Sequence, residues 1–189
     1  MNADGTNSHK VADGAGWACW SPDSQWLYVA PPTATGFSIK KLSPAGGPVL
    51  PVRDEGQKPA VAADGKLYFT TSLPALNGVS DMEIMVAEQD SGPARKLAQI
   101  SGSRLSPQIL AQPVLSPDGK WLALLLTDGP TTNIWAQPTA GGDMRRITDF
   151  GRQATFITRR VSWSSDGKSI FAAVGKGDAD IVLLTNLRP

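Results

Sequence analysis

One short pattern, which occurs four times, constrains the fold of this 189-residue chain more than any other feature of its sequence. Each copy is an apolar stretch, a turn around an aspartate and a second apolar stretch, and the copies span 19–29, 60–69, 114–124 and 162–172. An Asp-Gly pair between two hydrophobic runs predicts a β-hairpin, because the tight turn needs a residue that accepts positive φ. The first copy carries Asp23-Ser24 instead and is the weakest, because serine accepts positive φ less readily than glycine.

Two further strands are expected after each hairpin. The third strands are predicted at 37–42, 82–87, 133–137 and 180–184. After a glycine-rich turn, short fourth strands are predicted at 49–52, 95–98 and 145–148. Four-stranded units of roughly 40–50 residues indicate the blades of a β-propeller.

The fourth unit lacks its last strand, which we expect at the other end of the chain. Residues 9–13 resemble 145–149, which form the fourth strand of the third unit and the residues after it. A strand at 8–13 would complete the last unit and would remove two exposed sheet edges at once.

The prediction is therefore an all-β fold, a single propeller domain over 1–189 with four four-stranded blades. The blades are expected at about 15–53, 57–99, 111–150 and 159–189, and the strand at 8–13 closes the last one. Closure within one chain gives a ring of four blades. Closure across a head-to-tail homodimer by strand exchange gives eight, and we favour this dimer slightly because strand exchange is a low-cost route to closure. A third alternative is a fragment whose parent protein continues upstream.

The signature of the repeat resembles that of the TolB-type β-propeller family over essentially the whole chain. It is carried by Trp20-Ser21-Pro22-Asp23, Gly119-Lys120-Trp121-Leu122, Asn133-Ile134-Trp135 and Arg146-Ile147-Thr148-Asp149. The resemblance implies a bacterial propeller that binds a protein or peptide at the mouth of the ring, in the periplasm or otherwise outside the cytoplasm. Related propellers occur in prolyl-oligopeptidase-like and tricorn-type peptidases and in sensor kinases and regulators.

Composition excludes several classes of site. Eighteen Lys and Arg against seventeen Asp and Glu give a formal net charge of +1, so no basic excess is available to bind a nucleic-acid backbone. One cysteine and one histidine exclude a Cys/His zinc site and a disulfide framework within the chain. The longest apolar run, 121–126, is too short to cross a bilayer. We therefore expect no metal, no cofactor and no insertion into a membrane.

Several residues that could suggest chemistry are better explained as structural. A carboxylate at a hairpin tip caps its own turn, and this is expected of Asp23, Asp64, Asp118 and Asp166. The lone His9 is expected to face solvent on the terminal strand, and Cys19 is expected in the core. The pair Asp178 and Asp180 lacks the other oxygen ligands of a calcium loop. Large aromatic side chains at repeated positions are expected to pack between blades, and these are Trp20, Trp26, Trp121, Trp135 and Trp163.

Recognition residues are expected where the blades differ from one another at one repeated position. Trp17 occupies this position in the first blade, and its equivalents are Lys58, Gln112 and Arg160. Linkers between blades add further candidates, Arg104, Arg152 and Phe156. Arginines with a neighbouring aromatic suit an acidic or peptide partner, and loops at the mouth of a ring converge on its axis.

The sequence thus predicts a non-enzymatic module that binds proteins or peptides, with no catalytic residue. One alternative is an accessory or sensor propeller detached from a larger kinase, regulator or peptidase. Another is a hydrolase or lyase acting in the channel, against which stands the lack of a convergent acid–base pair. Residues 1–13 are polar and contain no apolar core of a signal peptide.

Overall fold

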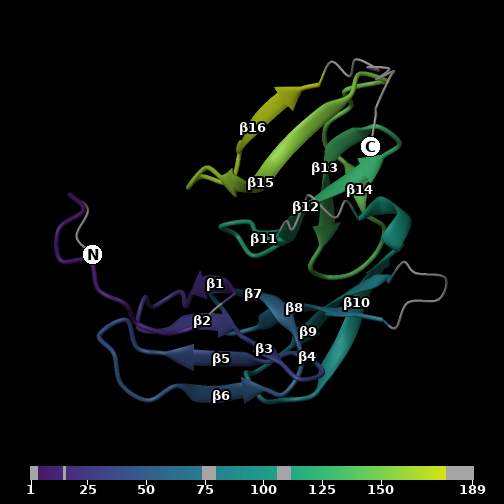
Figure 1. The fold of residues 1–189 in the computed structure, drawn as a ribbon. Coiled ribbons are helices and arrows are strands. Elements are labelled where there is room, and N and C mark those ends of the chain that lie inside the picture. The colour runs from purple at the N-terminus through teal and green to yellow at the C-terminus, as the bar shows by residue number, and fades with distance from the viewer. Residues whose placement is uncertain (1–3, 15, 74–79, 106–111, 178–189) are drawn as a thin grey trace, which may run out of the picture.

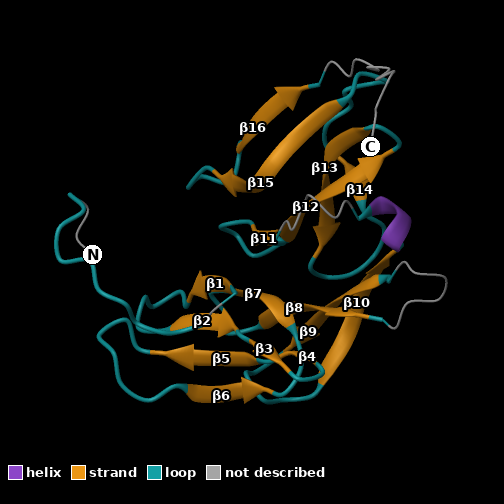
Figure 2. Ribbon diagram, in the orientation of Figure 1, coloured by secondary structure: helices purple, strands orange, loops and turns teal. Residues whose placement is uncertain are grey.

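The computed structural model describes residues 4–14, 16–73, 80–105 and 112–177. These residues form strands β1 to β16 and one turn of 3-10 helix, η1 (Gly102–Arg104), so the predicted all-β fold is confirmed. Figure 1 traces the chain through successive groups of strands, and Figure 2 shows that strands and loops make up nearly all of it.

The first two blades are four-stranded antiparallel sheets, as predicted. The first contains, in spatial order, β1 (Trp17–Trp20), β2 (Leu27–Ala30), β5 (Ile39–Leu42) and β6 (Leu50–Arg53). A small hairpin that the sequence did not predict, β3 (Pro32–Thr33) and β4 (Gly36–Phe37), lies between β2 and β5 along the chain. The second blade contains β7 (Gln57–Val61), β8 (Leu67–Ser72), β9 (Met82–Ala87) and β10 (Ala94–Ile100).

The third blade is complete and the fourth is described in part. The third contains β11 (Val114–Leu115), β12 (Trp121–Asp128), β13 (Thr131–Pro138) and β14 (Arg145–Arg146). The fourth begins with the antiparallel pair β15 (Thr155–Trp163) and β16 (Ile170–Lys176). A parallel pair of Thr131 with Thr155 connects the two blades. The third strand predicted at 180–184 lies outside the described residues, so the count of four complete blades stays a prediction.

The N-terminal segment differs from the prediction. Residues 8–13 form no strand, and Nε2 of the exposed His9 ring lies 3.3 Å from the carbonyl oxygen of Pro44 in the first blade. Figure 1 shows this end of the chain beside the first blade and away from β16. A strand needs a neighbouring strand to satisfy its backbone groups, and no described strand pairs with this segment. Closure of the ring by 8–13, within one chain or between two, stays a prediction.

Three hydrophobic cores hold neighbouring blades together. Tyr28, Ile39 and Val52 of the first blade pack with Leu67, Phe69 and Ala87 of the second. The opposite face of the second blade, with Tyr68, Ile84 and Val86, packs on Leu122, Leu124 and Leu126 of the third. Ala123, Leu125 and Ile134 of the third blade meet Ile157 and Val161 of the fourth. Burial of each sheet between its neighbours is what stabilises a row of blades.

A polar contact adds to the core between the first two blades. Asp90, in the turn between β9 and β10, accepts a hydrogen bond from the Tyr28 hydroxyl at 2.8 Å. Its other carboxylate oxygen lies 2.7 Å from Nζ of Lys41. The guanidinium of Arg53 donates to the backbone carbonyl of the same aspartate at 3.1 Å. One turn of the second blade thus binds three side chains of the first.

The hairpin tips confirm the structural role expected for the repeated aspartates. In the third blade the Ser116 hydroxyl donates to Asp118 Oδ1 at 2.6 Å, and the backbone N–H of Lys120 donates to the same oxygen at 3.1 Å. Equivalent bonds reach Asp23 and Asp166. The residue after the first of these, Ser24, has φ of 58°, the left-handed value that glycine supplies in the other hairpins.

Candidate functional site

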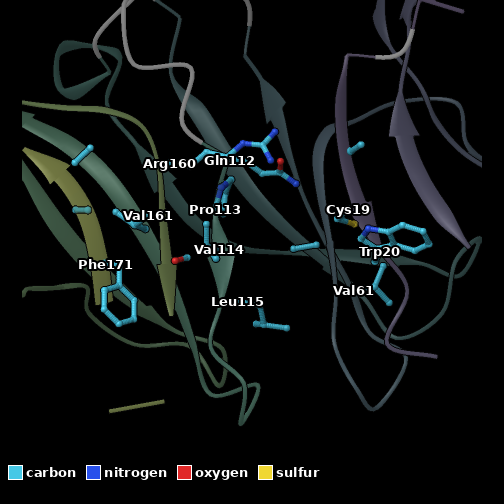
Figure 3. Close-up of a pocket in the computed structure, with 15 residues that line it drawn as sticks. Cys19, Trp20, Val61, Gln112, Pro113, Val114, Leu115, Arg160, Val161 and Phe171 are labelled. Atoms are coloured by element: carbon cyan, nitrogen blue, oxygen red, sulfur yellow. The ribbon is translucent and has the colours of Figure 1, made fainter. Parts of the chain in front are cut away.

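A pocket of about 640 Å³ lies where the inner strands of the four blades converge (Figure 3). This volume is within the range of ordinary ligand pockets. Strands β1, β7, β11, β15 and β16 or the residues beside them supply its wall. Most of the lining is apolar, with Trp20, Val61, Leu115, Val161 and Phe171 as the larger side chains. Gln112 and Arg160 supply the polar groups at one side, close to each other in Figure 3.

The four residues at the repeated position that differs between blades form two pairs in the structure. Gln112 and Arg160 line the pocket, and their role in recognition stays a prediction. Gln112 is buried, and its side-chain amide donates a hydrogen bond to the carbonyl of Pro59 in the second blade. Arg160 is exposed, so its guanidinium is available at the mouth of the pocket. The two residues therefore offer a fixed amide and an accessible cation beside one apolar cavity.

Trp17 and Lys58 form the second pair, on the first and second blades. Nζ of Lys58 lies 5.6 Å from the centre of the Trp17 ring, in the geometry of a cation–π contact. The Trp17 ring also contacts Phe37, edge to face, with 5.0 Å between the ring centres. Burial lowers the pKa of Lys58 because the charged ammonium loses hydration. These two side chains thus contact each other, and neither lines the pocket of Figure 3.

Arg104 is committed to the third blade. Its guanidinium lies 3.1 Å from a carboxylate oxygen of Asp128 and stacks over the Trp135 ring at 4.2 Å. The Trp135 indole N–H donates to the same carboxylate at 3.2 Å. These contacts hold the inter-blade linker against the end of β12, and a role of Arg104 in recognition stays a prediction.

Phe156 is the second residue of β15, and Arg152 lies just before this strand, next to the β12–β13 hairpin. The Thr131 hydroxyl of that hairpin donates to the carbonyl oxygen of Gln153, next to Arg152, at 2.8 Å. Arg152 is exposed, and the Phe156 side chain is exposed as well. The structure therefore separates these two from the pocket residues, and their recognition role also stays a prediction.

The sequence analysis did not predict that Trp20 and Phe171 line the pocket. Trp20 was expected to pack between blades, but it is 54% exposed and belongs to none of the three hydrophobic cores formed by the described residues. Its equivalent Trp163 does pack, against the third blade, and donates its indole N–H to Val114. Phe171, on β16, is exposed on the other side of the pocket (Figure 3). Their place in the repeat could have identified both residues, because this position is buried only where a neighbouring blade packs on it.

Cys19 also lines the pocket, half-buried and packed on the core between the first two blades. Burial raises the pKa of its thiol to about 12, because a thiolate there would lose hydration. The group is therefore a neutral thiol at physiological pH, which agrees with the core role expected from the sequence.

A group of metal ligands and a membrane-spanning helix are both missing from the described residues. Among them, no three His, Cys, Asp or Glu side chains are grouped so that they could hold a metal ion. In the same part of the chain, no helix is long and apolar enough to span a bilayer. The predicted loop at Asp178 and Asp180 lies outside the described residues. The described residues form a cavity with a mostly apolar wall and the exposed Arg160 at its mouth.

No protein-family model and no curated protein matches the chain in sequence. Solved structures match it in fold. TolB from Acinetobacter baumannii gives a TM-score of 0.63 at 20% identity, over 83% of this chain and 37% of that one. A putative TolB from Agrobacterium tumefaciens gives 0.62 at 20% identity, over 87% and 59%. A puromycin-hydrolyzing peptidase of Mycobacterium tuberculosis gives 0.58 at 17% identity, over 89% and 29%.

The chain therefore has the fold of the TolB-type β-propellers, as its repeat predicted. It spans 37% and 59% of the two TolB chains. At such identities the likeness shows the fold alone, and the function must be argued from the pocket.

Proposed function

We propose that the chain is a non-enzymatic binding module that binds a segment of a protein or peptide in the pocket of Figure 3. One observation carries this proposal: Gln112 and Arg160, which differ from their equivalents in the other blades, line a pocket whose wall is otherwise mostly apolar. An apolar side chain of the partner would fill the cavity. A carboxylate beside it would pair with the guanidinium of Arg160.

The chemistry of the pocket supports binding over catalysis. Its thiol, Cys19, is held in the neutral form, and the amide of Gln112 is engaged by the carbonyl of Pro59. A catalytic site needs a nucleophile or acid–base pair within hydrogen-bond reach of a shared point. Beside its apolar wall the pocket offers the exposed hydroxyl of Ser162 and the exposed guanidinium of Arg160, which suit recognition of an apolar segment with an acidic residue.

A selection experiment tests the proposal. We would select a phage-displayed library of 12-residue peptides on the immobilised chain and measure the affinity of each enriched peptide by fluorescence anisotropy. We expect enriched sequences to combine an aromatic or aliphatic residue with a nearby Asp or Glu. Arg160→Ala should weaken their binding by about 10-fold or more, because it removes a charge-assisted hydrogen bond.

Two further variants serve as controls. Arg152→Ala changes an exposed arginine outside the pocket, and binding of the selected peptides should survive it. Arg160→Glu reverses the charge at the mouth and should favour peptides with Lys or Arg in place of the acid. Peptides that bind Arg160→Ala and the unaltered chain equally would contradict the assigned site.

A second candidate is an accessory propeller of a larger enzyme or sensor. It is supported by the likeness to the Mycobacterium tuberculosis peptidase, where the matched region is 29% of that chain. Its test is the reading frame upstream of Met1, where a kinase, regulator or hydrolase sequence would support it. An extracytoplasmic location is proposed on the family resemblance of the repeat.

A further inference from the structure

The hairpin registers define two equivalent positions in every blade. Position A is the last residue of the first strand of a blade. Position B lies on the second strand and pairs with the residue that directly precedes position A; in the first blade, for example, Tyr28 pairs with Cys19. Position A is occupied by Trp20, Val61, Leu115 and Trp163. Position B is occupied by Tyr28, Tyr68, Ala123 and Phe171.

Each inter-blade core joins position B of one blade to position A of the next. Tyr28 and Val61 share the core between the first and second blades. Tyr68 and Leu115 share the next one, and Ala123 and Trp163 share the third. The same contact therefore recurs three times along the chain.

Among the described residues, the two halves of a fourth such contact are exposed, one on the first blade and one on the last. Phe171, position B of the last blade, is 62% exposed, although its equivalents Tyr28, Tyr68 and Ala123 are all buried. Trp20, position A of the first blade, is 54% exposed. The two rings stand on opposite sides of the axial pocket (Figure 3). Further out on the first blade, Val29 and Leu42 are already buried, so the open surface is concentrated at the inner strand.

We propose that a second copy of this chain covers both ends, head to tail, so that Phe171 of each copy packs on Trp20 of the other. The contact continues a series of three inter-blade interfaces that this chain already makes, with an aromatic residue at each missing position. A copy that carries both halves of such an interface can satisfy both open ends of its partner. Two such contacts, one at each end of the row, would join the two copies as a closed head-to-tail pair.

Assembly would also change the site. The pocket lies between the first and last blades of one copy, so a second copy seated on Trp20 and Phe171 would extend the cavity into a channel lined by two chains. The proposal does not depend on which ligand the pocket binds, and it is tested without one.

The test is the mass in solution. The chain has a mass of 20.0 kDa, and we expect sedimentation equilibrium to give twice this mass from low to high micromolar concentration. Trp20→Glu and Phe171→Glu should each give the monomer mass, because either change places a charge in every head-to-tail contact. Ile147→Glu, at an apolar residue of the third blade that is also exposed, is the matched control and should leave the dimer intact.

An equimolar mixture of the two end variants distinguishes head-to-tail contact from a symmetric one. Each variant retains one unaltered end, so the mixture should recover a heterodimer through a single good interface while each variant alone stays monomeric. Unchanged thermal unfolding of the two variants at low concentration would show that they fold. A monomer mass for the unaltered chain at all concentrations would overturn the proposal and leave the open faces to a different chain that presents a blade. A dimer that survives either end variant would overturn it as well.

Discussion

The faces between blades and the faces at the two ends of the row are built from the same repeated positions, yet Trp20 and Phe171 at the ends are exposed whereas their equivalents between blades are buried or half-buried. Tyr28 and Tyr68 are 5% and 4% exposed, whereas Phe171, at the equivalent position, is 62% exposed. The difference lies in the neighbour and not in the side chain. In a repeat fold, the end faces therefore carry the same positions that are buried wherever two repeats meet.

The largest expected effect contrasts an inner face with an end face. Leu122, fully buried between the second and third blades, should cost about 2–5 kcal/mol of unfolding free energy when changed to alanine, since a cavity remains. Phe171→Ala should cost no more than about 0.5 kcal/mol in the dilute monomer, because its ring contacts mostly solvent. Urea unfolding measures both, and equal losses would break the comparison.

A smaller effect is expected at the polar contact between the first two blades. Asp90→Ala leaves the Tyr28 hydroxyl and the Lys41 ammonium without their acceptor, which should cost about 1–3 kcal/mol. The control is Asp13→Ala, which removes an exposed ion pair with Lys10 and should change the unfolding free energy by less than about 1 kcal/mol. If the two variants unfold alike, the inter-blade contact adds nothing to the cores.

The smallest effect concerns the hairpin tips, which are built alike in inner and end blades. Hydrogen bonds from Ser116 and the Lys120 backbone hold the pKa of Asp118 below its ordinary value of 3.8. The ionised form is thus favoured in the folded state, and its contribution to stability is present above pH 3.8 and is lost as the pH falls through the lower, folded value. Asp118→Ala should therefore lower the melting temperature at pH 6 and have progressively less effect toward acid.

The last blade supplies the matched comparison for that prediction. Asp166 has the same partners, Ser164 and the Lys168 backbone, and its pKa is lowered for the same reason. Asp166→Ala should show the same direction and the same pH dependence in thermal melts. A difference in pH dependence between the two variants would show that the stability of a hairpin tip depends on whether its blade lies inside the row or at its end.

The sequence predicted the hairpins and most of the strands because their signals are local. An Asp-Gly turn between apolar runs is readable within ten residues, and β9 occupies the range 82–87 that was expected. The small hairpin of β3 and β4 was missed because it carries no such turn. The strand expected at 8–13 depended on a partner strand at 180–184, which lies outside the described residues, and the N-terminal segment lies beside the first blade.

The site was predictable only in part. The repeat alignment selected Gln112 and Arg160 as binding candidates, and both line the pocket, whereas the equivalent Trp17 and Lys58 do not; the binding role of all four stays a prediction. It could not show that Arg104 pairs with Asp128, because that contact joins a linker to the end of another strand. Nor could it show that Trp20 is exposed, since exposure depends on whether a blade precedes the first one.

Residue-level footprinting tests the central claim most directly. Hydroxyl-radical labelling, read by mass spectrometry, measures the exposure of Trp20 and Phe171 in the same sample, with Val49 and Ile147 as exposed controls. We expect labelling of Trp20 and Phe171 to fall together as the concentration rises, while the two controls stay constant. If either ring stays fully labelled at high micromolar concentration, the two ends are not joined head to tail and the account is contradicted.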